Sequence, residues 1–226
     1  MRLPIIPLLA VVLLLAPAPV PAATLEQMLA IMDRAGPGFR DMSALLKRAD
    51  YTPVLKETEE SLGLIRMKRA GPGDVRLLVE FKEPNPRSIA FEKAKAEIYY
   101  PKMQTVQVYN LGKSRSLVDQ FLLLGFGSTG GELKRNYSIR LLGEQQVSGE
   151  TTTQMELVPL TTAVLEHLKK AELWMAAAGY PLQQKIFTPN REYTFTYSDV
   201  KLNTNLPDSA LKLQLPKNVK REYPQK

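Results

Sequence analysis

Apolar and polar residues alternate with a period of two along much of the chain, a pattern typical of half-buried β-strands. Between residues 193 and 198, Tyr193, Phe195 and Tyr197 occupy the odd positions, and hydroxyl residues occupy the even ones. Leucines at 211, 213 and 215 repeat the alternation after a turn. We therefore expect strands that bury one face and leave the other in contact with water.

The same pattern predicts a hairpin at residues 63–69 and 75–82, joined by a glycine- and proline-rich turn at 70–73. In its second strand the apolar residues alternate with Arg76, Glu80 and Lys82. Further strands are predicted after Phe39 and at residues 88–92, 96–100, 105–110, 137–147, 151–158 and 172–177. No strand–helix–strand rhythm is present, so these strands, about ten or eleven in all, favour an antiparallel sheet.

A helix is predicted at residues 24–35, because Thr24 and Gln27 form a capping box and Gly36 and Pro37 follow the last turn. Its apolar stripe consists of Leu25, Met28, Leu29 and Met32. Such a stripe usually packs on the protein's own core. Alternatively, it lies over an apolar cavity as a removable lid, a role that suits the adaptable side chains of methionine.

A second helix is predicted at residues 116–124, a run that is too apolar for a segment facing solvent. It includes Phe121 and Leu122, and glycines flank it on both sides, the later ones at 125, 127, 130 and 131. We interpret these glycines as flexible joints about which the helix can swing. A third short helix at 162–170 is predicted to connect two strands.

Residues 1–22 are predicted to form a cleavable secretory signal, since Arg2 precedes an apolar run from Leu8 to Ala16 and Val20 and Ala22 suit a signal peptidase. The remaining residues, 23–226, are expected to form a single domain. The chain contains no cysteine, so we expect neither the lipidation of a bacterial lipoprotein nor a disulfide.

The formal net charge is +7, and loss of Arg2 with the signal lowers it to +6. In an exported protein this charge either maintains solubility or attracts the chain to anionic membrane surfaces. A nucleic-acid partner is not expected, because the basic residues are scattered among strands and match no reader motif.

Catalytic and metal sites are disfavoured because their usual ligands are scarce. His167 is the only histidine, and it lies beside Glu166 and Lys169 on the exposed side of a predicted helix. A zinc site or a histidine-based triad is therefore not expected. Residues 125–130 match Gly-x-Gly-x-x-Gly formally, but no parallel βαβ unit surrounds them. We predict a protein that is not an enzyme and that needs no cofactor or metal.

Several segments resemble the LolA-like family of periplasmic lipoprotein carriers. They are Gly179-Tyr180-Pro181-Leu182-Gln183, the tyrosine-rich strand at 193–200, Leu206-Pro207-Asp208-Ser209, Ala96-Glu97-Ile98-Tyr99-Tyr100-Pro101-Lys102, Phe121-Leu122-Leu123-Leu124-Gly125-Phe126-Gly127 and Leu157-Val158-Pro159. The resemblance implies a mainly β (α+β) fold, an unclosed antiparallel half-barrel covered by two or three helices. Carriers of this family steady the lid with an arginine on an early strand, a role that we assign to neither Arg40 nor Arg48.

The resemblance and the apolar faces together predict a cavity for acyl chains. Candidate cavity residues are Leu77, Val79, Phe81, Ile89, Phe91, Val106, Val108, Trp174, Tyr193, Phe195 and Tyr197. Candidate lid residues are Leu25, Met28, Leu29, Met32, Phe121, Leu122 and Phe126. The alternation alone does not decide which face of each strand lines the cavity.

The function that we expect is that of a soluble, monomeric periplasmic carrier, which moves lipid or lipoprotein acyl chains toward the outer membrane. Its implied partners are an exporter in the inner membrane and an acceptor at the outer membrane. The alternative is a lipid-responsive envelope sensor or interaction protein with the same fold. A carrier should contact an exporter, whereas a sensor should hold a regulator.

Overall fold

The computed structural model describes residues 23–71, 74–112 and 123–225. Its strands are β1 Asp41–Thr52, β2 Glu57–Gly71, β3 Asp74–Glu83, β4 Arg87–Glu92, β5 Lys95–Tyr100, β6 Thr105–Asn110, β7 Tyr137–Val147, β8 Glu150–Pro159, β9 Lys170–Met175, β10 Pro181–Phe187, β11 Glu192–Leu202 and β12 Lys220–Glu222. Its helices are α1 Leu25–Ala35, α3 Gly130–Asn136 and α4 Thr162–Leu165, with short 3-10 turns η1 Gly36–Gly38, η2 Pro101–Met103 and η4 Asp208–Leu211. The predicted signal at 1–22 and nearly all of the helix predicted at 116–124 lie outside the described residues.

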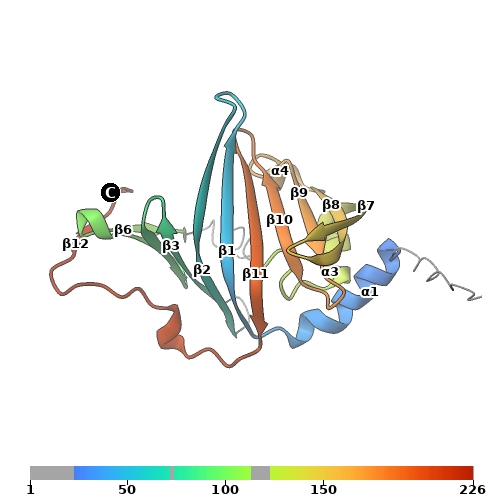
Figure 1. Cartoon of the computed structure of the whole chain (residues 1–226), viewed down its shortest axis with the longest axis horizontal. Helices are drawn as coiled ribbons and strands as arrows, with labels where there is room; N and C mark the ends of the chain where they lie inside the picture. Colours follow the sequence, from blue (N-terminus) through green and yellow to red (C-terminus); the bar gives the residue numbers. More distant parts are fainter. Residues whose placement is uncertain (1–22, 72–73, 113–122, 226) are drawn as a thin grey trace, which may run out of the picture.

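The twelve strands of the described residues form one sheet, in the order β12-β6-β5-β4-β3-β2-β1-β11-β10-β9-β8-β7 (Figure 1). Because β12 and β7 stand at opposite ends of this order, the sheet does not close. Neighbouring strands pair antiparallel, except that β12 pairs with β6 in parallel. The predicted unclosed antiparallel sheet is confirmed, and its parallel edge pair is a feature that the sequence did not predict.

The hydrogen-bond register divides the sheet into two faces. Val79 of β3 stands between Ile65 of β2 and Ile89 of β4, and Leu46 of β1 stands beside Tyr197 of β11. We call the face that carries these side chains the inner face, and the opposite one the outer face. Successive side chains of a strand alternate between the two faces.

Among the described residues, the helices α1 and α3 pack on the inner face at its β7–β9 end (Figure 1). The buried residues of this cluster include Met28, Leu29, Met32, Leu133, Met155, Leu157 and Leu173. A second cluster covers the middle of the sheet, where Phe126 packs against Phe39 and Tyr197 with ring centroids 6.2 and 5.2 Å apart. Within the described residues, neither α1 and α3 nor the loop that carries Phe126 covers the rest of the inner face.

The two longest helices of the described chain each begin with a capping box. In α1 the Thr24 side chain accepts a hydrogen bond from the Gln27 backbone N–H, as predicted, and Thr129 and Glu132 form the same reciprocal arrangement at the start of α3. The sequence analysis missed α3, because it interpreted Gly130 and Gly131 as part of a flexible joint. A Cβ atom at residue 130 would lie 2.6 Å from the backbone oxygen of Leu29, so this glycine allows α3 to approach α1 closely.

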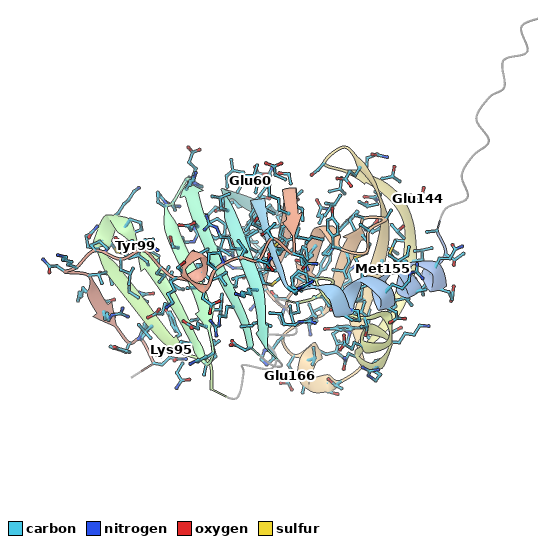
Figure 2. All side chains as sticks on the ribbon, turned by 90° about the horizontal axis from the view of Figure 1, so that it is seen from below. Glu60, Lys95, Tyr99, Glu144, Met155 and Glu166 are labelled. Carbon is cyan, nitrogen blue, oxygen red and sulfur yellow. The ribbon has the colours of Figure 1, made fainter. Side chains whose placement is uncertain are left out.

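The C-terminal segment crosses the outer face of the sheet (Figure 2). Its η4 turn contacts β2 and β3, and Asp208 forms ion pairs of 2.7 Å with both Lys68 and Arg76. The strand predicted at residues 211–215 is wrong, since Leu211 ends η4 and residues 212–215 join no strand. The leucines nevertheless alternate in burial with Lys212 and Gln214.

The other predicted elements differ mainly at their ends. The strands predicted at 105–110 and 137–147 coincide with β6 and β7. The connector helix predicted at 162–170 is reduced to α4, because the chain enters β9 at Lys170. No helix of the described residues combines the length and apolarity needed to span a bilayer.

We expect Gly130→Ala to lower the free energy of unfolding by about 1–3 kcal/mol, because the added methyl group overpacks the contact between α1 and α3. Gly131→Ala is the matched control, since the nearest atom to a Cβ there is a side-chain nitrogen of Arg135 at 3.6 Å. Urea unfolding of both variants measures the difference. Equal stabilities would contradict the close approach of the two helices.

A candidate apolar pocket on the inner face

An apolar pocket of about 360 Å³ lies on the uncovered part of the inner face. Its walls come from β1, β2, β3 and β4 on one side and from β10 and β11 on the other. The lining residues are Leu46, Arg48, Ile65, Leu77, Val79, Phe81, Ile89, Phe91, His167, Gln184, Ile186, Thr188, Tyr193, Phe195 and Tyr197. The volume lies within the range of small-molecule sites, roughly 300–1,000 Å³.

The register explains why the walls are continuous and apolar. Leu77, Val79 and Phe81 alternate on β3, and the first two pair with Phe91 and Ile89 of β4. On the opposite wall, Ile186 of β10 pairs with Tyr193 of β11. Because paired residues share a face, each strand adds its apolar side chains to the same surface.

The structure brings eight of the predicted cavity residues together in this pocket, namely Leu77, Val79, Phe81, Ile89, Phe91, Tyr193, Phe195 and Tyr197. The other three lie on the outer face. Val106 and Val108 pair with Tyr99 and Glu97 of β5. Ile98 lies between these two residues and pairs with the inner-face residue Ile89, so Tyr99, Glu97 and their partners point to the outer face. Trp174 follows the inner-face residue Leu173 and donates a 2.9 Å hydrogen bond from its indole nitrogen to Gln145. The placement of Val106, Val108 and Trp174 in the cavity is therefore wrong.

The predicted lid residues do not line the pocket. Leu25, Met28, Leu29 and Met32 of α1 pack on the cluster over β8 and β9, which corresponds to the structural alternative for this helix. Phe126 is 1% exposed and belongs to the central cluster, where its ring meets the edge of Tyr197. Phe121 and Leu122 lie outside the described residues.

The glycine-rich loop before α3 is held by side chains from several strands. Arg69 donates a 2.9 Å hydrogen bond to the carbonyl of Gly127, and Gln184 donates one to the carbonyl of Leu124. Gly127 has φ +69°, and a Cβ there would lie 2.8 Å from the Phe39 ring. At Gly127 the missing side chain thus allows the loop to pack closely on Phe39, a role that the interpretation as flexible joints did not include.

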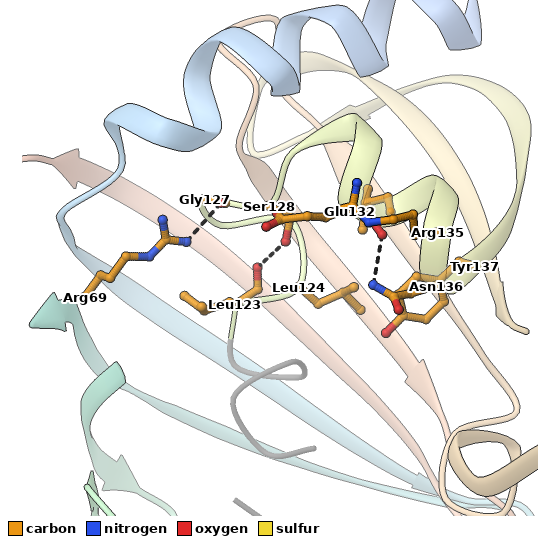
Figure 3. Close-up of a pocket in the computed structure, with 10 residues that line it drawn as sticks. Arg69, Leu123, Leu124, Gly127, Ser128, Glu132, Arg135, Asn136 and Tyr137 are labelled. Atoms are coloured by element: carbon orange, nitrogen blue, oxygen red, sulfur yellow. Dashed lines mark hydrogen bonds between the residues drawn. The ribbon is translucent and has the colours of Figure 1, made fainter. Parts of the chain in front are cut away.

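A second cavity of about 360 Å³ lies between this loop, α3 and the start of β7 (Figure 3). Its lining includes charged and polar side chains, among them Arg69, Glu132, Arg135 and Asn136. Several of these polar groups bond within the cavity wall: Ser128 donates to the carbonyl of Leu123, and Asn136 to that of Glu132 (Figure 3). The pocket on the inner face is therefore the better candidate for an apolar ligand.

Two buried polar side chains form the floor of the apolar pocket. The Tyr197 hydroxyl donates a 2.6 Å hydrogen bond to Oε1 of Gln184, whose amide nitrogen donates to the loop carbonyl of Leu124. Burial raises the pKa of Tyr197, so its hydroxyl stays protonated. This chain of bonds ties β11 and β10 to the loop that carries Phe126.

An ion pair stands at the other end of the pocket. Nη2 of Arg48 lies 2.7 Å from Oδ2 of Asp50, and the two side chains are 19% and 12% exposed. Arg48 lines the pocket, and its guanidinium lies within 6 Å of the ring centroids of Phe81, Tyr193 and Phe195. Burial raises the pKa of Asp50, although the charge of Arg48 opposes this effect.

Sequence reasoning missed seven lining residues: Leu46, Arg48, Ile65, His167, Gln184, Ile186 and Thr188. Leu46 and Arg48 are two residues apart on β1, so the alternation places them on the same face and could have identified both as lining residues. Gln184 could not be found in this way, because a polar residue in an apolar strand position normally indicates the wet face. Only the partner strands show that it is buried.

His167 is exposed and stands at the edge of the pocket. Its backbone N–H donates a 3.0 Å hydrogen bond to the carbonyl of Val164. None of the described acidic and histidine side chains group into a metal site.

Comparisons with known proteins identify relatives by structure only. No family model and no curated protein sequence matches the chain. Among solved structures, MucB matches with a TM-score of 0.51 and 15% identity over 84% of this chain, which spans 62% of the MucB chain. An uncharacterized conserved protein from Thermus thermophilus matches with a TM-score of 0.53 and 14% identity, over 88% of this chain and 98% of the other.

LolA superfamily protein NE2245 from Nitrosomonas europaea also matches, with a TM-score of 0.40 and 14% identity over 85% of this chain and 99% of the other. At these identities the likeness is one of fold. The chain, an open antiparallel sheet with helices packed on part of its inner face, shares its overall fold with MucB and with the Thermus thermophilus protein.

We expect Tyr197→Phe to lower the free energy of unfolding by about 1–2 kcal/mol, because it leaves the buried carbonyl of Gln184 without a donor. Tyr193→Phe is the control, since the Tyr193 hydroxyl has no hydrogen-bond partner among the described residues. Denaturant unfolding compares the two variants. A loss at Tyr193 as large as that at Tyr197 would argue against the buried network.

Proposed function

We propose that this protein binds the acyl chains of lipids or lipoproteins in the apolar pocket and carries them through the periplasm toward the outer membrane. The observation that carries this proposal is the pocket itself. Its walls are built from aliphatic and aromatic side chains of β3, β4 and β11, with few polar groups among them. Such a surface favours a ligand that is itself largely hydrocarbon.

The hydrophobic effect supplies enough free energy for this role. Each buried methylene contributes about 0.8 kcal/mol, so ten methylenes contribute roughly 8 kcal/mol before the cost of ordering the chain. The lining residues Ile89, Phe91, Ile186 and Phe195 remain partly exposed, so they offer apolar area that a chain would cover. Binding of this kind needs no catalytic group, and we propose that the protein is not an enzyme.

The proposed compartment rests on the predicted signal, and the proposed partners rest on the resemblance to LolA-like carriers. We propose that residues 1–22 direct export and that residues 23–226 act as a single domain in the periplasm. An exporter in the inner membrane would load the carrier, and an acceptor at the outer membrane would receive its cargo. The net positive charge would favour approach to anionic lipid surfaces.

Native mass spectrometry of the protein, purified from a lysate that contains membranes, tests the binding role. We expect adducts with the masses of acylated molecules, because the pocket offers uncovered apolar area. The chemical identity of the adduct also distinguishes a lipid from a lipoprotein. A protein that stays free of ligand after exposure to membranes would contradict the proposal.

Cross-linking in cells separates a carrier from the alternative, a lipid-responsive sensor. A carrier should be captured with an inner-membrane exporter and an outer-membrane acceptor. Stable capture of a regulatory protein, with no exporter, would favour the sensor.

A pair of substitutions on β4 tests whether the inner face is the binding surface. We expect Ile89→Gln to weaken binding of a fluorescent fatty acid about fivefold or more, because it places an amide in the apolar wall. Ser88→Gln introduces the same side chain one residue earlier, where the register directs it to the outer face, and should change affinity less than twofold. Equal effects in a fluorescence titration would contradict the assignment of the faces.

A further inference from the structure

We propose that the Arg48–Asp50 ion pair recognises the carbonyl group that links an acyl chain to its parent molecule, and that it disfavours free fatty acids. This inference rests on the proposed function and specifies the class of ligand. The acceptable ligand would be an acyl ester or amide, with its chain on the apolar walls and its uncharged carbonyl at Arg48.

The position of Arg48 is the first argument. It is the one arginine or lysine among the residues that line the described pocket. Its guanidinium lies 5.7, 5.2 and 5.9 Å from the ring centroids of Phe81, Tyr193 and Phe195, respectively. Phe195 is also its cross-strand partner, and Tyr193 is the partner of Asp50. The rings of three residues thus hold the charged group against the apolar wall instead of letting it extend into water.

The hydrogen bonds of the pair are the second argument. Within the described residues, Arg48 donates a single hydrogen bond, from Nη2 to Oδ2 of Asp50 at 2.7 Å. Nε of Arg48 and Oδ1 of Asp50 are buried and have no hydrogen-bond partner in the described part of the chain. A guanidinium has several N–H groups and no acceptor, so its remaining capacity can be met only by an acceptor such as a carbonyl oxygen.

The local charge is the third argument, and it distinguishes a carbonyl from a carboxylate. Asp50 already balances Arg48, and burial raises the pKa of this carboxyl despite the neighbouring cation. The same loss of hydration would penalise a second carboxylate placed beside it. Glu59 adds negative charge near Asp50, and Arg191 adds positive charge.

Arg87 faces the same end of the pocket, with its guanidinium 4.5 Å from the Phe81 ring centroid, but it does not line the pocket. An uncharged carbonyl meets the free donors of Arg48 and leaves the ion pair intact. This chemistry occurs in the ester bonds of a glycerolipid and in the amide bond of an acylated protein N-terminus.

Four short probes with matched chains separate these possibilities: methyl decanoate, N-methyldecanamide, decanoate and dodecane. Each competes with a fluorescent methyl ester of a fatty acid for the full mature chain at neutral pH. We expect the ester or the amide to bind at least about fivefold more tightly than dodecane, and more tightly than decanoate. A preference for the ester would indicate a glycerolipid, and a preference for the amide an acylated protein.

Two variants test the role of the pair. Asp50→Asn leaves Arg48 without its counter-charge, so the affinity ratio of decanoate to methyl decanoate should rise at least about tenfold. Glu144→Gln makes the same change in net charge on an exposed residue of β7, at the far end of the sheet (Figure 2), and should shift the ratio less than twofold. The double variant Arg48→Met/Asp50→Leu removes both charges and should abolish the preference for a carbonyl over dodecane.

Arg87→Met is the control for the arginine, because it removes a cation from the same Phe81 ring without changing the pocket lining. This variant should retain the preference for a carbonyl. Equal binding of ester and dodecane by the unaltered protein, or equal shifts in Asp50→Asn and Glu144→Gln, would overturn the inference and leave the proposed function standing. Failure of all four probes to bind would instead contradict the proposed function, and the inference with it.

Discussion

The structure depends on an imbalance between a wide, curved, open sheet and the few elements that cover its inner face. α1 and α3 cover the β7–β9 end, and Phe126 covers the middle. Within the described residues, Ile89, Phe91 and Phe195 of this face stay partly exposed, so apolar area remains available there. An exposed apolar surface of this kind is costly in water and usually marks a site of binding. The proposed function rests on this one constraint, because an acyl chain would complete the burial that the described residues leave unfinished.

The period-two pattern predicted the strands well, because alternation depends on local sequence. It predicted a shared face correctly where only one face is apolar, as in Leu77, Val79 and Phe81 of β3. It failed at Val106 and Trp174, which are buried on the outer face. When both faces of a strand are buried, the sequence of that strand does not show which face is the inner one. That information is in the register with partner strands, and it becomes available only after the sheet has formed.

The start of α3 and the surroundings of Arg48 also could not be predicted from the local sequence. The capping box at Thr24 was recognised because an apolar stripe follows it, whereas the equivalent box at Thr129 was hidden by two glycines. Gly130 lies against the backbone of Leu29, where a larger residue would not fit. Arg48 is a comparable case. Its sequence neighbours identify it as a strand residue, but the rings around it come from β3 and β11. The polar end of the pocket is therefore a property of the tertiary structure.

In the proposed complex, an acyl chain lies between the β3–β4 wall and the β10–β11 wall of the inner face. NMR spectra of the methyl groups, recorded with a spin-labelled methyl ester of a fatty acid, test this position. We expect the label to broaden the methyl signals of Ile89 and Ile186, which stand on the two walls. The signals of Val106, on the outer face, should stay sharp. Broadening confined to Leu133, beside the polar cavity of Figure 3, or broadening of outer-face residues alone, would contradict it.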